Sequence, residues 1–302
     1  MFEDWVVGCD NGLRCKAVSL QPTVASDSSD LSIERGAGPD DKPVLMLDLR
    51  SDSKAAAIWF DRTKVPIRVA SATGAIFGVD TLQLTRLVQK ATTIRLADES
   101  GQVISTISAL GASAALRWLD ERQGRVGSTS AIVAVGSRLS GKAPPTLPTI
   151  RPAKPSSAAF KSLGARQVSA LRAKDDCFDA DDRPVRYHRL DSTTTLALVP
   201  CLVGAYQVTS IVALVSNSGR SRLAPLEFSD EPSTLIDAEF LQDKRVLWSS
   251  FKGRGIGDCG GTDKYLWDGV RFRLAYRDRM DECRGTADRI PIWRTTNETT
   301  AR

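Results

Sequence analysis

The densest group of residues that could bind a ligand lies in the glycine-rich stretch 248–283, which reads WSSFKGRGIGDCGGTDKYLWDGVRFRLAYRDRMDEC. Glycine permits backbone bends that a Cβ would forbid, and consecutive amides between cationic side chains can hold an anion. The candidate binding residues of this stretch are Lys252, Gly253, Arg254, Gly255, Gly257, Asp258 and Trp267. The simpler interpretation is a bent connector beside a disulfide, whose charged side chains are only solvated.

The same loop does not match nucleotide-binding motifs, because no Gly-Lys-Ser/Thr and no predicted helix follows its glycines. A hydrolase would need a nucleophile with its base, or two carboxylates in one cleft. Asp258 with Asp263 or Asp268 could supply the carboxylates, but aspartates are also common in turns. The chain has one histidine, His188, and no Gly-x-Ser-x-Gly motif, so the sequence offers few residues from which a catalytic triad could form. We therefore expect no catalytic residue and no cofactor.

Acidic residues gather at 175–182, where five aspartates could offer oxygen ligands to calcium. The spacing and the closing glutamate of a calcium loop are absent, so we expect an exposed acidic turn held by Cys177. Zinc has almost no ligand set, because the cysteines lack Cys-x-x-Cys spacing and His188 stands alone. We expect no bound metal.

The six cysteines, an even number beside polar turn residues, predict disulfides formed in an oxidising compartment. Six cysteines allow 15 connectivities. Pairing sequence neighbours gives the hypothesis Cys9–Cys15, Cys177–Cys201 and Cys259–Cys283. A three-residue hairpin loop, 11–13, would place Cys9 directly opposite Cys15, close enough for a bridge.

Composition limits the classes of protein to which this chain can belong. It has 302 residues, of which 42% are apolar, enough for the cores of two domains. Its net charge of +5 is spread along the chain, without the basic stripe of a nucleic-acid surface. No apolar run approaches the roughly 18 residues of a membrane helix. The first residues lack the features of a signal peptide, so we expect Met1 to stand where a leader was removed.

Most of the chain alternates apolar and polar residues in short runs between turn signals, which is the pattern of antiparallel strands. Helices are predicted at 81–91, with Asp80 as N-cap, at 110–123 and at 157–173. Five prolines from Pro144 to Pro155 predict an extended linker, or a strap along one domain.

These elements predict a mainly β fold, or α+β, with two sandwich-like or barrel-like antiparallel β domains, a few short helices and disulfide staples. We expect an N-terminal β domain at 1–140 and a proline-rich linker at 141–156. The C-terminal domain, 157–302, is expected to be β-rich with one leading helix.

The pair Asp268-Gly269 between alternating apolar residues predicts a hairpin with a type I′ turn. This turn would place Trp267 opposite Val270. The residues predicted to share the apolar face of the hairpin are Tyr265, Trp267, Val270, Phe272 and Leu274.

Several segments together resemble one family: WVVGCDNGLRCKAV, LVPCLVGAYQ, KGRGIGDCGG, LWDGVRFRL and DECRG. They look like the six-cysteine secreted bacterial proteins catalogued as domain of unknown function 1176, and the resemblance spans nearly the whole chain. It implies a periplasmic location and no assigned reaction. One departure is Leu202, where the family would have an aromatic residue after the fourth cysteine.

The first half is also similar, more weakly, to the invasion-associated locus B family. The similarity rests on the WxVxC pattern near the start and on LGASAALRWLDE at the end of the half. It implies a small secreted β-sandwich linked to the cell envelope or to host contact, and it supplies no catalytic residues.

Three functions are consistent with these observations. The favoured one is a non-catalytic module that binds an envelope protein or a cell-wall polymer through its sheets or its glycine loop. The first alternative is an envelope hydrolase that uses the loop carboxylates. The second is a disulfide-stapled inhibitor or structural protein, whose exposed aromatic residues would lie at loop tips.

Overall fold

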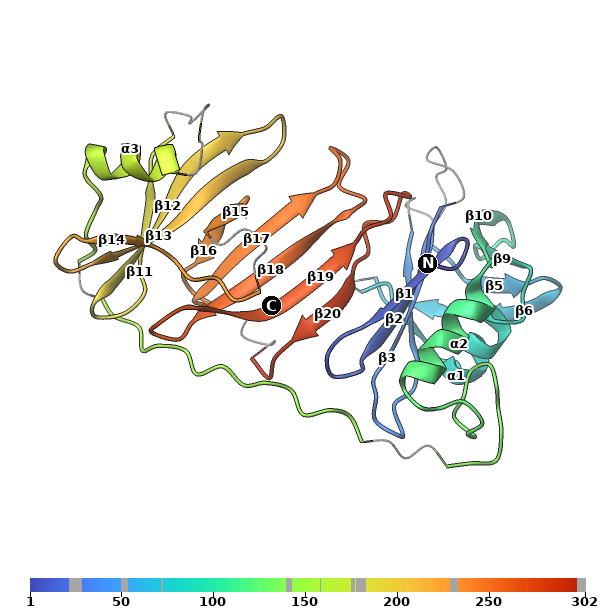
Figure 1. The fold of residues 1–302 in the computed structure, drawn as a ribbon. Coiled ribbons are helices and arrows are strands. Elements are labelled where there is room, and N and C mark those ends of the chain that lie inside the picture. Colours follow the sequence, from blue (N-terminus) through green and yellow to red (C-terminus); the bar gives the residue numbers. More distant parts are fainter. Residues whose placement is uncertain are drawn as a thin grey trace. The chain divides into compact units, whose positions relative to one another are not determined.

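The protein folds into two compact units in this computed structural model, which describes residues 1–21, 29–49, 54–71, 73–139, 143–157, 159–174, 177, 183–228 and 233–297 (Figure 1). Unit 1 comprises Met1–Thr146, Gly257–Cys259 and Arg279–Ile292. Unit 2 comprises Leu147–Ile256, Gly260–Asp278 and Trp293–Arg302. The division at 146/147 falls inside the expected linker, 141–156. Two short C-terminal stretches nevertheless group with unit 1. A division of the chain at one linker does not predict this exchange.

Unit 1 contains two four-stranded antiparallel sheets and a short two-stranded one. The first sheet has the order β1-β2-β3-β4, formed by Trp5–Cys9, Cys15–Ser19, Asp30–Arg35 and Val44–Asp48. The second has the order β10-β9-β5-β6, formed by Val103–Ser108, Thr93–Ala97, Ala57–Phe60 and Thr63–Pro66. The third pairs β7 (Arg68–Val69) with β8 (Ile76–Phe77). The mainly antiparallel β architecture predicted from the sequence is confirmed.

Two helices pack on these sheets. In α1 (Thr81–Val88), Asp80 is the N-cap, and its carboxylate accepts hydrogen bonds from the Leu82 and Gln83 amides, as expected. α2 (Ala112–Arg122) contacts β1 and β2. Inward-facing side chains of both sheets and both helices form one continuous core that includes Trp5. Both helices are shorter at their C-termini than the apolar periodicity predicted.

The outer face of β1 and β2 is covered by the C-terminal stretches that belong to unit 1. Val18 and Leu20 pack there with Met280, Ile290 and Cys259. The bridge Cys259–Cys283 joins the two stretches. β2 is buried along its whole length for this reason, since its two faces lie in two different cores.

The first hairpin has the predicted geometry. Cys9 is directly opposite Cys15, and the Asp10 amide bonds to the Arg14 carbonyl, which leaves the three residues 11–13 as the loop. The structure contains the three disulfides that pairing of sequence neighbours predicted: Cys9–Cys15, Cys177–Cys201 and Cys259–Cys283.

Unit 2 is built on two sheets. One has the order β11-β12-β13-β14, with β15 also paired to β13; its strands are Arg186–Arg189, Thr194–Val203, Val208–Ser216, Ser221–Leu223 and Thr234–Ile236. The other has the order β16-β17-β18-β19-β20, formed by Glu239–Leu241, Val246–Lys252, Gly260–Trp267, Phe272–Met280 and Ile290–Arg294. Residues 279–280 of β19 and 290–292 of β20 group with unit 1. The two sheets share a core that includes Leu198, Val212, Leu247 and Tyr265.

The opposite face of the first sheet is covered by α3 (Ala165–Lys174), whose Leu171 packs on Val199 and Ile211. The predicted helix 157–173 is wrong in its first half, because the described residues of that half before Ala165 form no helix. There Phe160 stacks on Tyr187 at 5.6 Å between ring centroids. Tertiary packing decides this segment against its helical propensity.

The proline-rich segment is a strap along unit 2, the second of the two predicted alternatives. Ile150 packs on Val246, Leu266 and Ala275, on the face of the second sheet that is turned away from the shared core. The Ala153 amide bonds to the Trp267 carbonyl at 2.8 Å. The strap is the extended green segment that precedes α3 in Figure 1.

The β18–β19 turn lies one residue later than predicted. The Asp268 amide bonds to the Arg271 carbonyl, and the Asp268 carboxylate accepts from the Val270 and Arg271 amides. Gly269 has φ +100° whereas Val270 does not have positive φ, so the central pair is Gly269-Val270. Four of the five residues predicted to share the apolar face are in the core, and Val270 is 68% exposed instead.

No helix in the described part of the chain is long and apolar enough to cross a membrane.

The two disulfides of unit 1 close loops of different length, which predicts different contributions to stability. We expect Cys259→Ser/Cys283→Ser, whose bridge has a sequence separation of 24, to lower the free energy of unfolding by about 3 kcal/mol. Cys9→Ser/Cys15→Ser, with a separation of 6, should cost about 1 kcal/mol less, because loop entropy grows with the logarithm of loop length. Urea unfolding followed by tryptophan fluorescence measures both losses. Equal losses would contradict the chain-entropy argument.

Candidate functional site

The glycine loop predicted to bind a ligand follows β17. Lys252 is the last residue of that strand and is exposed, as are Gly253 and Gly255, while Arg254 is half-buried. Gly257 has φ +75° and groups with unit 1. The part of the candidate loop that belongs to unit 2 is therefore 252–256.

The hairpin between β12 and β13 lies beside this loop within unit 2. The Gln207 side chain holds the two together, since its Oε1 accepts from the Lys252 amide at 2.5 Å and its Nε2 donates to the Lys252 carbonyl at 3.2 Å. A Cβ built on Gly255 would lie 3.7 Å from the Tyr206 ring, which is ordinary contact distance. The loop and the hairpin tip therefore form one local surface.

Large apolar side chains are exposed on this surface. Ile256 is 73% exposed and Tyr206 is 47% exposed. Leu202 and Val203, the last residues of β12, are 42% and 37% exposed. We call the set of Leu202, Val203, Tyr206, Lys252, Arg254 and Ile256 the loop-tip surface.

A β-bulge explains why β12 leaves the core at this point. Pro200 pairs with Ser210 and Leu202 pairs with Thr209, so Cys201 is the extra residue on β12. The seven residues up to Cys201 are buried, and the two after it are exposed. Because a bulge bends and twists its strand, and Cys201 is also tied to Cys177, the hairpin tip is directed out of the sandwich.

The charge of the loop-tip surface is positive. Segments 202–207 and 252–256 contain Lys252 and Arg254 and no acidic residue. An apolar surface with two cationic side chains is suited to a ligand that combines acidic and apolar groups.

Two of the predicted site residues lie elsewhere. Trp267 is 3% exposed in the core of unit 2, where its indole donates to the Asp191 carboxylate at 2.7 Å and its ring contacts Phe272. Asp258 is 5% exposed within unit 1, and its carboxylate accepts from the Gly285 amide at 2.8 Å. The candidate loop thus brings together Lys252, Arg254 and their glycines, without Trp267 or Asp258.

The sequence analysis missed Leu202, Val203 and Tyr206, because it located no hairpin tip at these residues. Gly204 directly after an apolar strand was the available turn signal. Exposure of the neighbouring side chains depends on the bulge and the hairpin pairing, which no local pattern showed.

The carboxylates considered for hydrolysis are engaged in structural contacts. Asp263 is paired with Arg277 through two hydrogen bonds of 2.8 and 2.7 Å, and it accepts from the hydroxyl of Tyr265. Asp268 holds the β18–β19 turn. These contacts give the aspartates roles in the fold.

The His188 ring contacts the Phe240 ring in a tilted arrangement with centroids 5.2 Å apart, and burial lowers the pKa of His188. Its Nε2 is buried and makes no hydrogen bond to the described residues. Among those residues no three His, Cys, Asp or Glu side chains are grouped as a metal site would require. The acidic stretch 175–182, proposed for calcium, lies outside the described residues except for Cys177.

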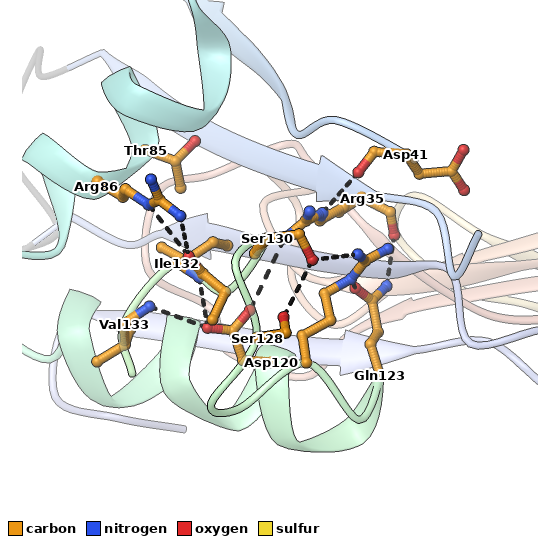
Figure 2. Close-up of polar contacts among 12 residues, drawn as sticks. Arg35, Asp41, Thr85, Arg86, Asp120, Gln123, Ser128, Ser130, Ile132 and Val133 are labelled. Carbon is orange, nitrogen blue, oxygen red and sulfur yellow. Dashed lines mark hydrogen bonds and ion pairs between the residues drawn. The ribbon is translucent and has the colours of Figure 1, made fainter. Parts of the chain in front are cut away.

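The most deeply buried charges form a network in unit 1 (Figure 2). Asp120 accepts from the Ile132 and Val133 amides at 2.7 and 3.0 Å, and the guanidinium of Arg35 lies 3.9 Å from its other oxygen. Arg35 also donates to the carbonyls of Asp41 and Ser130. The network joins α2 to two loops.

Arg125 and Gln123 extend this network. Arg125 donates to the side chains of Gln123 and Ser130, and Gln123 donates to the carbonyls of Arg35 and Gly36. Burial raises the pKa of Asp120 and, together with repulsion from Arg125, lowers the pKa of Arg35 to about 10. Because these groups bond mainly to backbone, we assign them to the fold of unit 1.

Comparison with known proteins gives the family. The profile described as "Protein of unknown function (DUF1176)" matches residues 1–300. The chain belongs to this family. The family resemblance based on the cysteine-bearing motifs is thereby confirmed. A curated relative, "Uncharacterized protein YpfG" of Escherichia coli (strain K12), is 27% identical over an alignment of 307 positions that covers 90% of this chain and 85% of the relative. No solved structure matches the chain.

The buried Asp120 predicts a pH dependence of stability. Its folded-state pKa is above the unfolded value, so the folded protein binds this proton more tightly, and the contribution of Asp120 to the free energy of unfolding decreases as pH rises through that window. Asp120→Asn abolishes this titration. We therefore expect the free energy of unfolding of Asp120→Asn to rise relative to that of wild type as pH increases above about 4, the ordinary pKa of an aspartate.

Urea unfolding at a series of pH values measures this difference, with Glu121→Gln as an exposed control on the same helix. If the free energy of unfolding of wild type instead rises relative to that of Asp120→Asn as pH increases, Arg35 and Arg125 keep the Asp120 carboxylate ionised.

Proposed function

We propose that the protein is a non-catalytic binding module of the cell envelope, and that its loop-tip surface binds a protein partner which presents acidic side chains beside apolar ones. The observation that carries this proposal is the exposure of Tyr206 and Ile256 beside Lys252 and Arg254 on two loops joined by Gln207. Exposed apolar side chains that lie together on a folded domain are typical of interaction surfaces.

The rigidity of this surface supports the proposal. The Cys177–Cys201 bridge ties β12 to Cys177, whose amide bonds to the Arg172 carbonyl of α3, and Gln207 fixes the loop against the hairpin. Surfaces whose shape exists before binding lose less conformational entropy on association, which favours affinity. An aromatic side chain and an arginine, both present on this surface, are enriched in protein interaction hot spots.

The disulfides support an envelope location. All six cysteines are paired, in three bridges within the two units. Such bridges persist in oxidising compartments, of which the bacterial periplasm is one. The hydrolase alternative gains no support from Asp263 and Asp268, whose contacts hold a strand pair and a turn.

We predict that a photo-reactive amino acid placed at position 256, with the protein expressed in the periplasm, will form a covalent adduct with its partner. The same amino acid at position 244, on the exposed turn at the opposite end of β17, should form none. The adduct, detected on denaturing gels and identified by mass spectrometry, should be reduced about tenfold by Lys252→Glu/Arg254→Glu, because two favourable charge interactions become repulsive.

Lys244→Glu is the matched charge control, since it reverses an exposed lysine at the other end of the same strand. Binding of the purified partner should weaken with added salt for wild type. Equal adducts at positions 244 and 256, or an adduct unaffected by the double reversal, would refute the assignment of the surface.

A further inference from the structure

A pocket of about 420 Å³ lies within unit 2, at the base of the β12–β13 hairpin. Its lining comes from β11, β12, β13, β17 and the connection from β15 to β16. The pocket shares no residue with the loop-tip surface, although Pro200 and Val208 lie on either side of the hairpin tip. Its volume is within the roughly 300–1,000 Å³ that is usual for small-molecule sites.

Ser210 supplies this pocket with a polar group that the fold itself does not use. The residue is 2% exposed, and it lines the pocket together with Val208. Side chains alternate along β13, so Ser210 and Val208 share one face of the sheet while Ile211 packs on the opposite face, beneath α3. Within the described part of the chain the Ser210 hydroxyl makes no hydrogen bond. Because a buried hydroxyl without a partner is costly, this group is available to a ligand.

The wall around that hydroxyl is apolar. Pro200 is the register partner of Ser210 and also lines the pocket, and Val208 lies two residues before Ser210 on the same strand face. A ligand group that fits here must present a hydrogen-bonding atom beside an apolar one. An acetamido group does so, because its amide can bond to the hydroxyl while its methyl group packs on the proline and the valine.

The charged residues of the lining are balanced in number. Two arginines, Arg183 and Arg186, and two acidic residues, Asp237 and Glu239, line the pocket. Asp237 is engaged in the fold, since its carboxylate accepts a hydrogen bond from the Val208 amide at 2.8 Å. Because the formal charges cancel, the lining favours a neutral ligand over an anion or a cation.

Two further side chains of the lining favour a sugar over a peptide. Glu239 and Trp248 are register partners on β16 and β17, and both line the pocket. Neither side chain makes a hydrogen bond to the residues that the structure describes. A carboxylate accepts hydrogen bonds from hydroxyl groups, and an indole offers an apolar ring with an N–H donor at its edge. A sugar ring matches both, since it carries hydroxyls around its rim and C–H groups on its faces.

We propose that this pocket binds a neutral sugar that carries an acetamido group, either free or as part of a glycan. The acetamido group bonds to Ser210 and packs on Pro200 and Val208, and the ring lies against Trp248 with its hydroxyls toward Glu239. The site is independent of the protein partner proposed for the loop-tip surface, and neither proposal requires the other.

The test is isothermal titration calorimetry of the intact chain with N,N′-diacetylchitobiose as the probe. We expect wild type to bind this disaccharide and Ser210→Ala to bind it about fivefold more weakly, because one neutral hydrogen bond is lost. Without ligand, Ser210→Ala should melt no lower than wild type, since the hydroxyl has no partner in the described fold. Cellobiose, which lacks the acetamido groups, should bind more weakly to wild type and equally to both proteins.

Ser221→Ala, which removes a hydroxyl from β14 of the same sheet, is the protein control. N-acetylglycinamide, which has an acetamido group and no sugar ring, is the ligand control. The proposal is overturned if wild type does not bind the disaccharide at millimolar concentration, if Ser210→Ala binds it like wild type, if Ser221→Ala weakens binding equally, or if N-acetylglycinamide binds as tightly as the disaccharide. Comparison of N-acetylglucosamine with its tetramer separates the two sources of the ligand, since tighter binding of the tetramer identifies a glycan and equal binding a free sugar.

Discussion

Burial of strands on both faces is the constraint on which the rest of this structure depends. β2 lies between the unit 1 core and the C-terminal cover, and β12 lies between the sandwich core and α3. A strand that is apolar on both faces needs a layer on each side to exclude water. The chain provides these layers from segments distant in sequence, such as the proline strap and the stretches 257–259 and 279–292.

This arrangement decides where function can lie. The loop-tip surface exists because a bulge directs β12 out of the core. The proposed site is therefore a consequence of where this strand leaves its core.

Several residues lie elsewhere than the sequence analysis expected, and they show which sequence patterns predict position in the fold poorly. Trp267 was assigned to the binding loop through its nearness in sequence, but the strand β18 carries it into the core. The turn after it shifted by one residue because the Asp268 side chain binds two amides and so occupies the first turn position. Segment 157–164 has helix-forming residues but forms no helix where it is described, and Phe160 stacks on Tyr187 there.

By itself, the sequence determined the mainly β class, the family, the three disulfide pairs and the cap of α1, because these depend on alternation, on spacing and on contacts between residues close in the chain. Only the tertiary structure decided which segments cover each sheet and which loop residues stay exposed. Those features depend on pairing between strands and on packing between segments far apart in sequence, and a local pattern carries no information about either.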